Sequence, residues 1–270
     1  MPMNPTPRSW QTLVRVLLFC LLCAIILAVV SPLAARLPAQ WSQLALGSVA
    51  TLATFILTLL FIRWEGFRLP DIGAMPGSQS PPRFALGFLI GLTLVALQSL
   101  LLAVIGHVHW VHTPQSNLAP TATALLLYLI LATREELAFR GYPLRVLDRI
   151  FGPWPAQLIV AFIFALEHRA GGYTWLHAFF GAALGSLLFG IAALTTRGLA
   201  LPIGIHAALN FGLWLTGANN SSGPWHPVIE KAFESRFDQL NSLAYLIVMT
   251  VAILLFYRYA NKHHLLNTPK

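Results

Sequence analysis

The chain alternates long apolar runs with short polar connections. Each run approaches the roughly 20 residues that an α-helix needs to cross a bilayer. The runs predict eight spans, at residues 16–34, 41–62, 84–106, 121–146, 154–168, 175–195, 199–216 and 242–257. The first run follows Arg8 and Arg15, as the core of a signal peptide would, but its apolar stretch is long, so we expect a retained helix.

This order of runs predicts an all-α fold, a polytopic transmembrane helical bundle of about eight spans. We expect one integral membrane domain in three parts: three N-terminal spans in 1–120, four central spans in 121–216, and an outer loop, the last span and a polar tail in 217–270. Apolar and charged residues alternate in 141–153, which predicts an amphipathic interfacial helix. The outer segment 217–241 is compatible with an interfacial helix or with a partner surface.

Composition and charge support a membrane protein. Of the 270 residues, 57% are hydrophobic and 10% are charged, against about 25% charged in soluble domains. The net charge of +8 comes from basic residues at the ends of apolar runs, which indicates membrane topology and no nucleic-acid partner. With a cytoplasmic N-terminus most Lys and Arg lie inside, and an even number of spans puts both termini there. We therefore expect a multi-pass protein of the cytoplasmic (plasma) membrane, in contact with the lipid bilayer.

The densest group of charges inside an apolar run is Glu135, Glu136 and Arg140, with Arg134 beside them. Ionisable groups within a bilayer are costly and usually functional. Glu136 and Arg140 are four residues apart, so they share a helix face and are expected to pair. Glu135 points about 100° away from that face and remains a candidate general base. The alternative interpretation is a structural ion network that holds helices together.

Two more polar positions lie in later runs. His168 ends the fifth run, while His206 and Asn210 are four residues apart and share one face of the seventh. Taken singly, His168 is typical of a helix end, and His206 with Asn210 is typical of interhelical hydrogen bonding. Counting residues from the span ends puts Glu135 and His206 at similar depth but leaves His168 nearer the outer face.

Together these positions resemble the three ordered motifs of one family, the CAAX-protease and bacteriocin-processing family (CPBP, also called Abi proteins), which includes the type II CAAX prenyl endopeptidases. The resemblance covers about residues 125–215. It rests on Glu135-Glu136-x-x-x-Arg140, continued by Gly141, on Phe164-x-x-x-His168 and on His206-x-x-x-Asn210. Each motif alone is weak, but three in order on apolar spans are specific.

The resemblance implies an intramembrane endopeptidase with a cavity open to the cytoplasm. It implies that Glu135 and His168 activate a water and that His206 and Asn210 hold the oxyanion, which are roles that carboxylate, imidazole and amide groups can fill. The implied partner is a membrane-bound protein or peptide substrate, such as a CAAX-box protein during maturation.

The resemblance also bears on tuning and cofactors. Glu136 and Arg140 are implied to be structural or to tune the site. The family is often called a metalloprotease, and Glu135, His168 and His206 are three candidate ligands for Zn, with a water in the fourth position. The alternative is a metal-free glutamate mechanism, and we favour no tightly bound metal. No organic cofactor is expected.

Two other function classes remain as alternatives to the peptidase. Intramembrane Glu and His residues also serve proton relays, so an ion-coupled transporter is one alternative. A transporter predicts inverted repeats, which the sequence does not display. The other is a non-catalytic immunity or scaffold membrane protein, which predicts that Glu135→Ala leaves the protein's activity in cells intact.

Overall fold

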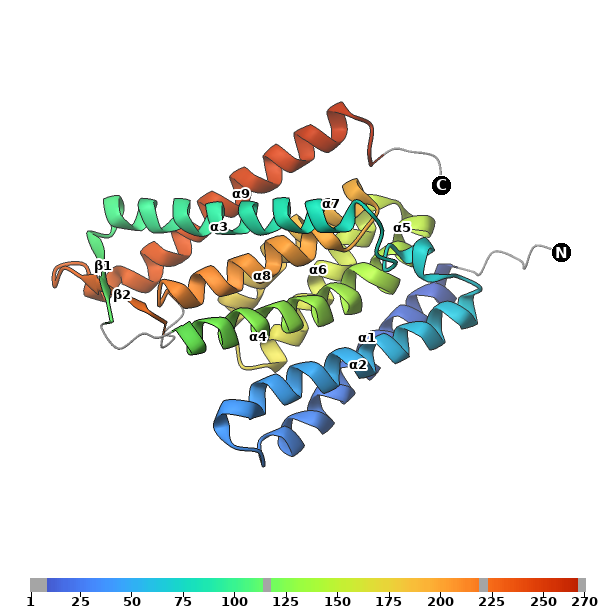
Figure 1. The fold of residues 1–270 in the computed structure, drawn as a ribbon. Helices are drawn as coiled ribbons and strands as arrows, with labels where there is room; N and C mark the ends of the chain where they lie inside the picture. The colour runs from blue at the N-terminus through green and yellow to red at the C-terminus, as the bar shows by residue number, and fades with distance from the viewer. Residues whose placement is uncertain (1–8, 114–117, 219–222, 267–270) are drawn as a thin grey trace.

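The protein is a bundle of helices with one small pair of strands at its end (Figure 1). The computed structural model describes residues 9–113, 118–218 and 223–266. The longer helices are α1 (Ser9–Ala34), α2 (Ala39–Glu65), α3 (Ser80–Ile105), α4 (Leu118–Glu136), α6 (Pro153–Ala170), α7 (Ala183–Thr196), α8 (Ala200–Leu215) and α9 (Phe237–Lys262). The shorter elements are η1 (Leu69–Ile72), β1 (Val108–His112), η2 (Leu137–Gly141), α5 (Tyr142–Phe151), η3 (His177–Ala182), β2 (Trp225–Ile229) and η4 (Glu234–Arg236).

The prediction of an all-α membrane bundle is confirmed, since all eight apolar runs fall on helices. Among the residues that the structure describes, five helical segments are long and apolar enough to cross a membrane: Trp10–Ala34, Ala39–Glu65, Ser80–Ile105, His177–Thr196 and Glu234–Lys262. The helix α8 is apolar but shorter. The helix α4 ends in three consecutive charged residues, and it is not one of the five segments that are long and apolar enough to cross a membrane.

The outer loops differ from expectation because they contain strands. β1 and β2 pair antiparallel, with Trp110 opposite Pro227, at the end of the bundle where α3 ends and α9 begins (Figure 1). Within the described part of 217–241 the chain forms β2, then η4 and the start of α9. The pairing ties the connection after α3 to the one after α8, and this contact between loops far apart in sequence has no local signal.

Glycines set a very close crossing of α3 and α8, and this crossing fixes α8 in place. A Cβ atom added to Gly87 would lie 2.2 Å from the carbonyl oxygen of Leu201, and one added to Gly91 would lie 2.5 Å from that of Ile205. On the other helix, a Cβ at Gly204 would lie 2.3 Å from the carbonyl oxygen of Phe84. Small residues spaced four apart permit this backbone approach between membrane helices.

The segment predicted to be an interfacial helix is instead largely internal. The helix α4 passes into a π-helical turn, η2, and then into α5, whose first six residues, from Tyr142 to Leu147, are all buried. The chain reverses at Gly152, which has a φ of 85°, and α6 returns along α5. The chain thus continues from Glu135 as far as Gly152 before α6 runs back in the opposite direction to His168. This excursion removes the difference in depth that simple counting gave.

Candidate active site

His206 lies between the two glutamates that end α4. Its Nδ1 atom is 2.8 Å from Oε1 of Glu136, and its Nε2 atom is 3.7 Å from Oε2 of Glu135. The Glu136 side chain is fully buried, while the Glu135 side chain retains 19% exposure. Oε2 of Glu135 makes no hydrogen bond to any described residue. One carboxylate therefore anchors the imidazole, and the other faces its free edge.

The predicted ion pair between Glu136 and Arg140 is present, one helical turn apart at the end of α4 and in η2. Nη1 of Arg140 lies 3.2 Å from Oε1 of Glu136, and both side chains are fully buried. The guanidinium carbon also lies 4.6 Å from the ring centre of Phe164 and 5.2 Å from that of Phe189. Aromatic faces attract such a cation. Arg140 is thereby held beneath the site by one carboxylate and by aromatic rings from α6 and α7.

The ring of His168 is oriented by its own helix. Its Nδ1 atom lies 2.9 Å from the carbonyl oxygen of Phe164, one turn earlier in α6. A carbonyl oxygen only accepts hydrogen bonds, so the proton of this contact belongs to Nδ1. In the neutral ring, Nε2 then carries the lone pair that can take a proton. The ring centre of Phe164 lies 4.3 Å from that of His168 and 6.4 Å from that of His206.

The ring of His206 is held flat against Phe189. The two rings stack with centres 4.4 Å apart and planes 15° from parallel. Asn210 lies one turn further along α8, is half-buried, and makes no hydrogen bond to another described residue. The side-chain amide of Asn210, on the same helix as His206, therefore has no hydrogen-bond acceptor in the described chain.

Arg134 does not pair with the candidate base. Its Nη1 atom lies 2.6 Å from Oε1 of Glu167 on α6, and the Arg134 side chain is 4% exposed. Arg134, which precedes Glu135 in sequence, and Glu167, which precedes His168, thus neutralise each other. This ion pair joins α4 to α6 next to the site.

The structure brings together five of the six residues that the sequence singled out, Glu135, Glu136, Arg140, His168 and His206, while Asn210 lies one turn further along α8. It also adds side chains that sequence reasoning missed. Phe189 stacks on His206, and Tyr173 packs edge-on against His168 with ring centres 5.1 Å apart. Aromatic residues in an apolar chain carry no local signal for such roles. Glu167 was visible as a charge in an apolar run, but its partner Arg134 lies on another helix.

The candidate zinc ligands do not form a ligand set as they are placed. Within residues 9–113, 118–218 and 223–266, no three His, Cys, Asp or Glu side chains gather closely enough to share one metal ion. Nδ1 of His206 and Nδ1 of His168 are also both engaged with protein acceptors. Each ring thereby keeps its Nε2 atom for a proton, a hydrogen bond or a metal ion.

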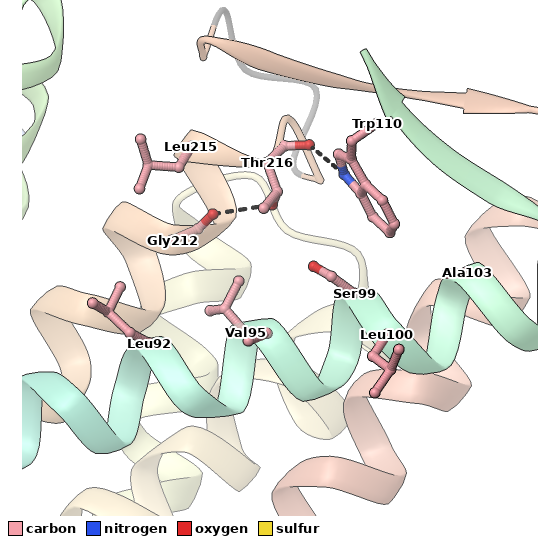
Figure 2. A pocket seen from close by; sticks show the side chains of 10 residues that line it. Leu92, Val95, Ser99, Leu100, Ala103, Trp110, Gly212, Leu215 and Thr216 are labelled. Atoms are coloured by element: carbon pink, nitrogen blue, oxygen red, sulfur yellow. Dashed lines mark hydrogen bonds between the residues drawn. The ribbon is translucent and has the colours of Figure 1, made fainter. Parts of the chain in front are cut away.

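Two apolar cavities lie away from these residues. One, of about 500 Å³, lies between α3, α8 and β1, where Nε1 of Trp110 donates to the carbonyl oxygen of Thr216 at 3.0 Å (Figure 2). The other, of about 710 Å³, is a groove between α3 and α9. Neither lining includes a candidate site residue, so the polar cluster and the apolar cavities are separate features.

Comparison with protein families finds a match over the part of the chain that builds this cluster. Residues 117–212 match the family model described as Type II CAAX prenyl endopeptidase Rce1-like. The match contains all three motifs and extends from α4 to α8. A comparison with curated proteins finds no match. The match over residues 117–212 supports the resemblance to the CPBP (CAAX protease) family that the three motifs indicate.

Proposed function

We propose that the protein is an intramembrane endopeptidase that hydrolyses a membrane-associated protein or peptide precursor, of the kind that prenylated CAAX substrates represent. The family match supports a peptidase, and the five long apolar helices support a site within the bilayer. The observation that carries the proposal is that His206 and His168 both lie close enough to Glu135 to interact with its carboxylate, whose Oε2 lacks any hydrogen-bond partner in the described chain.

In the proposed reaction, Glu135 and His168 activate one water. The water oxygen attacks the scissile carbonyl carbon while a proton passes to the carboxylate of Glu135 or to Nε2 of His168. When the tetrahedral intermediate collapses, the C–N bond breaks and that proton moves to the leaving amine. The contact between Nδ1 of His168 and the carbonyl oxygen of Phe164 supports this role, because it leaves Nε2 as the accepting atom.

His206 and Asn210 are the proposed donors to the oxyanion. With Nδ1 of His206 bonded to Glu136, the ring donates from Nε2 when that atom also carries a proton. The side-chain amide of Asn210, one turn away on α8, supplies a second donor. Such donors lower the barrier because they are already aimed at the place where charge develops. Glu136 and Arg140 act as positioning residues, since they hold the ring of His206 without reaching the substrate.

We further propose that both chain ends face the cytoplasm and that the protein resides in the plasma membrane. The start of α1 and the end of α9 point toward the same end of the bundle (Figure 1). That end also carries most of the chain's arginines, as the positive-inside rule requires of a cytoplasmic face.

The test is cleavage by the purified, detergent-solubilised protein of a fluorogenic prenylated peptide and of membrane-anchored precursors. Wild type is compared with Glu135→Gln and His168→Ala at equal folded concentration. Loss of a general base lowers the rate by about 10²–10⁴-fold, so both variants should be nearly inactive while unfolding at the wild-type temperature.

The control variant is Glu230→Gln, which removes a carboxylate of 60% exposure from the outer loop and should cleave at the wild-type rate. Wild-type turnover in Glu135→Gln would contradict the proposed base. A parallel incubation with a chelator separates the metal-free glutamate mechanism from a zinc metalloprotease mechanism. Activity that survives metal removal supports the glutamate mechanism, and activity that is lost and restored by Zn supports a metalloprotease.

A further inference from the structure

Arginines gather at the end of the bundle where α3 and α8 begin, opposite the strands. Arg145 is buried within α5, and its Nη2 atom donates to the carbonyl oxygen of Ala193 at 2.8 Å. Nη1 of Arg83 donates to the carbonyl oxygen of Thr196 at 2.9 Å. Both acceptors lie in the last turn of α7, so two cations cap the negative end of that helix.

Two more guanidinium groups complete the cluster. Arg197 follows α7 in a left-handed conformation with a φ of 51° and is exposed. Arg149 is exposed on α5, and its Nη2 atom donates to the carbonyl oxygen of Asp71 at 3.2 Å. We call Arg83, Arg145, Arg149 and Arg197 the arginine cluster.

The backbone at Gly73 packs against the side chain of Arg145 and the backbone of Arg197. A Cβ atom there would lie 3.1 Å from Nη2 of Arg145 and 2.9 Å from the carbonyl oxygen of Arg197. The carbonyl oxygen of Gly73 accepts from the amide of Leu199 at 3.2 Å, which joins the loop around η1 to the start of α8. The cluster is thus built on packed backbone and does not consist of scattered surface charges.

The cluster keeps an excess of positive charge. Asp148 is close enough to Arg145 to interact with it, and the carboxylate of Asp71 accepts from the backbone amide of Arg68. Nε of Arg145 is buried without a hydrogen-bond partner among the described residues. Arg197 and Arg149 are also close enough to Arg145 to repel it. An anion beside the exposed groups of Arg149 and Arg197 would relieve this repulsion.

An apolar groove lies on the same helix as Arg83, beginning about two turns further along α3. It lies between α3 and α9, has a volume of about 710 Å³, and is lined on α3 from Leu89 to Val104. Ile90 lies seven residues beyond Arg83, so the two share one face of α3. From the other helix, Ile247 to Phe256 complete the lining. The only polar side chain in the groove is Thr93.

We propose that the arginine cluster and the groove together bind one anionic phospholipid, with the phosphate among the guanidinium groups and an acyl chain between α3 and α9. Guanidinium groups match phosphate geometry with paired hydrogen bonds, and basic pockets between membrane helices bind anionic head groups. A neutral apolar occupant would leave the charge excess uncompensated, and a free phosphate would leave the groove without a role. This site is separate from the catalytic cluster and does not depend on the proposed peptidase function.

The test is lipid binding to the purified full-length protein, measured by native mass spectrometry with dioleoylphosphatidylglycerol and dioleoylphosphatidylcholine. Wild type should retain the phosphatidylglycerol in preference to the phosphatidylcholine. Arg149→Gln combined with Arg197→Gln leaves Arg83 and Arg145, which cap α7, in place. It should weaken phosphatidylglycerol binding by about fivefold for each arginine removed, with phosphatidylcholine binding unchanged.

A matched control removes two charges from the same end of the bundle but outside the site, with Arg63→Gln combined with Lys262→Gln. It should keep the wild-type preference. Thr93→Trp, on an exposed position of the groove, should weaken binding of phosphatidylglycerol but not of inorganic phosphate. Equal retention of the two lipids by wild type, or an equal loss in the control, would overturn the proposal.

Two further measurements distinguish the phospholipid from two other occupants, a free phosphate and a second copy of the chain. If inorganic phosphate competes fully with phosphatidylglycerol and Thr93→Trp has no effect on the lipid, the cluster is a free-phosphate site and the lipid assignment is wrong. If Thr93→Trp instead converts a dimer to a monomer in detergent without changing lipid retention, the groove is an interface between copies of the chain, which also contradicts the proposal.

Discussion

Removing the charge of Glu136 should destabilise the protein more than any substitution of an exposed carboxylate. Glu136 is fully buried, lies 3.2 Å from Nη1 of Arg140 and accepts from Nδ1 of His206. In Glu136→Gln the guanidinium of Arg140 stays buried with its nearest counter-ion gone, and it has no hydrogen-bond acceptor among the described residues. The aromatic rings around it offset only part of that loss.

The magnitude follows from this burial. Breaking a buried ion pair by removing one partner costs about 3–5 kcal/mol, which is roughly a 10²- to 10⁴-fold smaller ratio of folded to unfolded protein. Removing both charges, as in Glu136→Gln with Arg140→Met, leaves no unpaired ion, and the Met side chain fits the aromatic surroundings of the guanidinium. The double variant should therefore recover most of the stability that each single variant loses.

The assay is a double-mutant cycle on the free energy of unfolding in detergent, with equal lipid and pH for all four proteins. We expect a coupling energy of at least about 2 kcal/mol between the two positions, within the range for contacting residues. As a control, Arg68→Gln breaks a pair in which Arg68 is 85% exposed and the N–O distance is 3.9 Å, and it should cost well under about 1 kcal/mol. Additive losses in the cycle would refute the reasoning, because they would mean that Arg140 does not depend on Glu136.

Two further predictions concern the placement of α8. Gly91→Leu should lower the unfolding temperature and the cleavage activity together, because a Cβ there would lie 2.5 Å from the carbonyl oxygen of Ile205 and overpacking costs about 1–3 kcal/mol or more. The control in the same thermal and cleavage assays is Gly77→Ala, since a Cβ at Gly77 would have nothing within 4 Å. Equal effects of the two substitutions would contradict the close crossing of α3 and α8. Asn210→Ala should lower kcat by about 10²–10³-fold with little change in unfolding temperature if the amide donates to the oxyanion; an unchanged kcat would remove Asn210 from the mechanism.

The parts of the site that follow from helix geometry were predictable from sequence. The spacing of Glu136 and Arg140 predicts their pairing, because residues four apart lie on one helix face whatever surrounds them. The spacing of Phe164 and His168 likewise underlies the hydrogen bond from the imidazole to the backbone carbonyl. The apolar runs predicted every long helix, because burial in lipid and in the bundle needs the same side chains.

The parts that depend on contacts between helices were not predictable from one sequence. That His206 would bond to Glu136 and face Glu135 requires the crossing of α4 with α8, which no local pattern encodes. The same holds for the π-helical turn η2 and the buried α5, since the alternating charges of that segment suit an interface equally well. One signal was available and unused. Gly87 and Gly91 have the spacing typical of close helix pairs, and they pack against α8.

The central claim is that Glu135 activates the water that breaks a peptide bond. It is tested most directly by cleaving one substrate in H₂¹⁸O with wild type and with Glu135→Gln, followed by mass spectrometry of both fragments. We expect one ¹⁸O atom in the new carboxyl terminus for wild type, and a rate lower by about 10²–10⁴-fold for the variant at unchanged stability. Cleavage by Glu135→Gln at the wild-type rate, or no cleavage by folded wild-type protein of any membrane-anchored or prenylated peptide, would contradict the account.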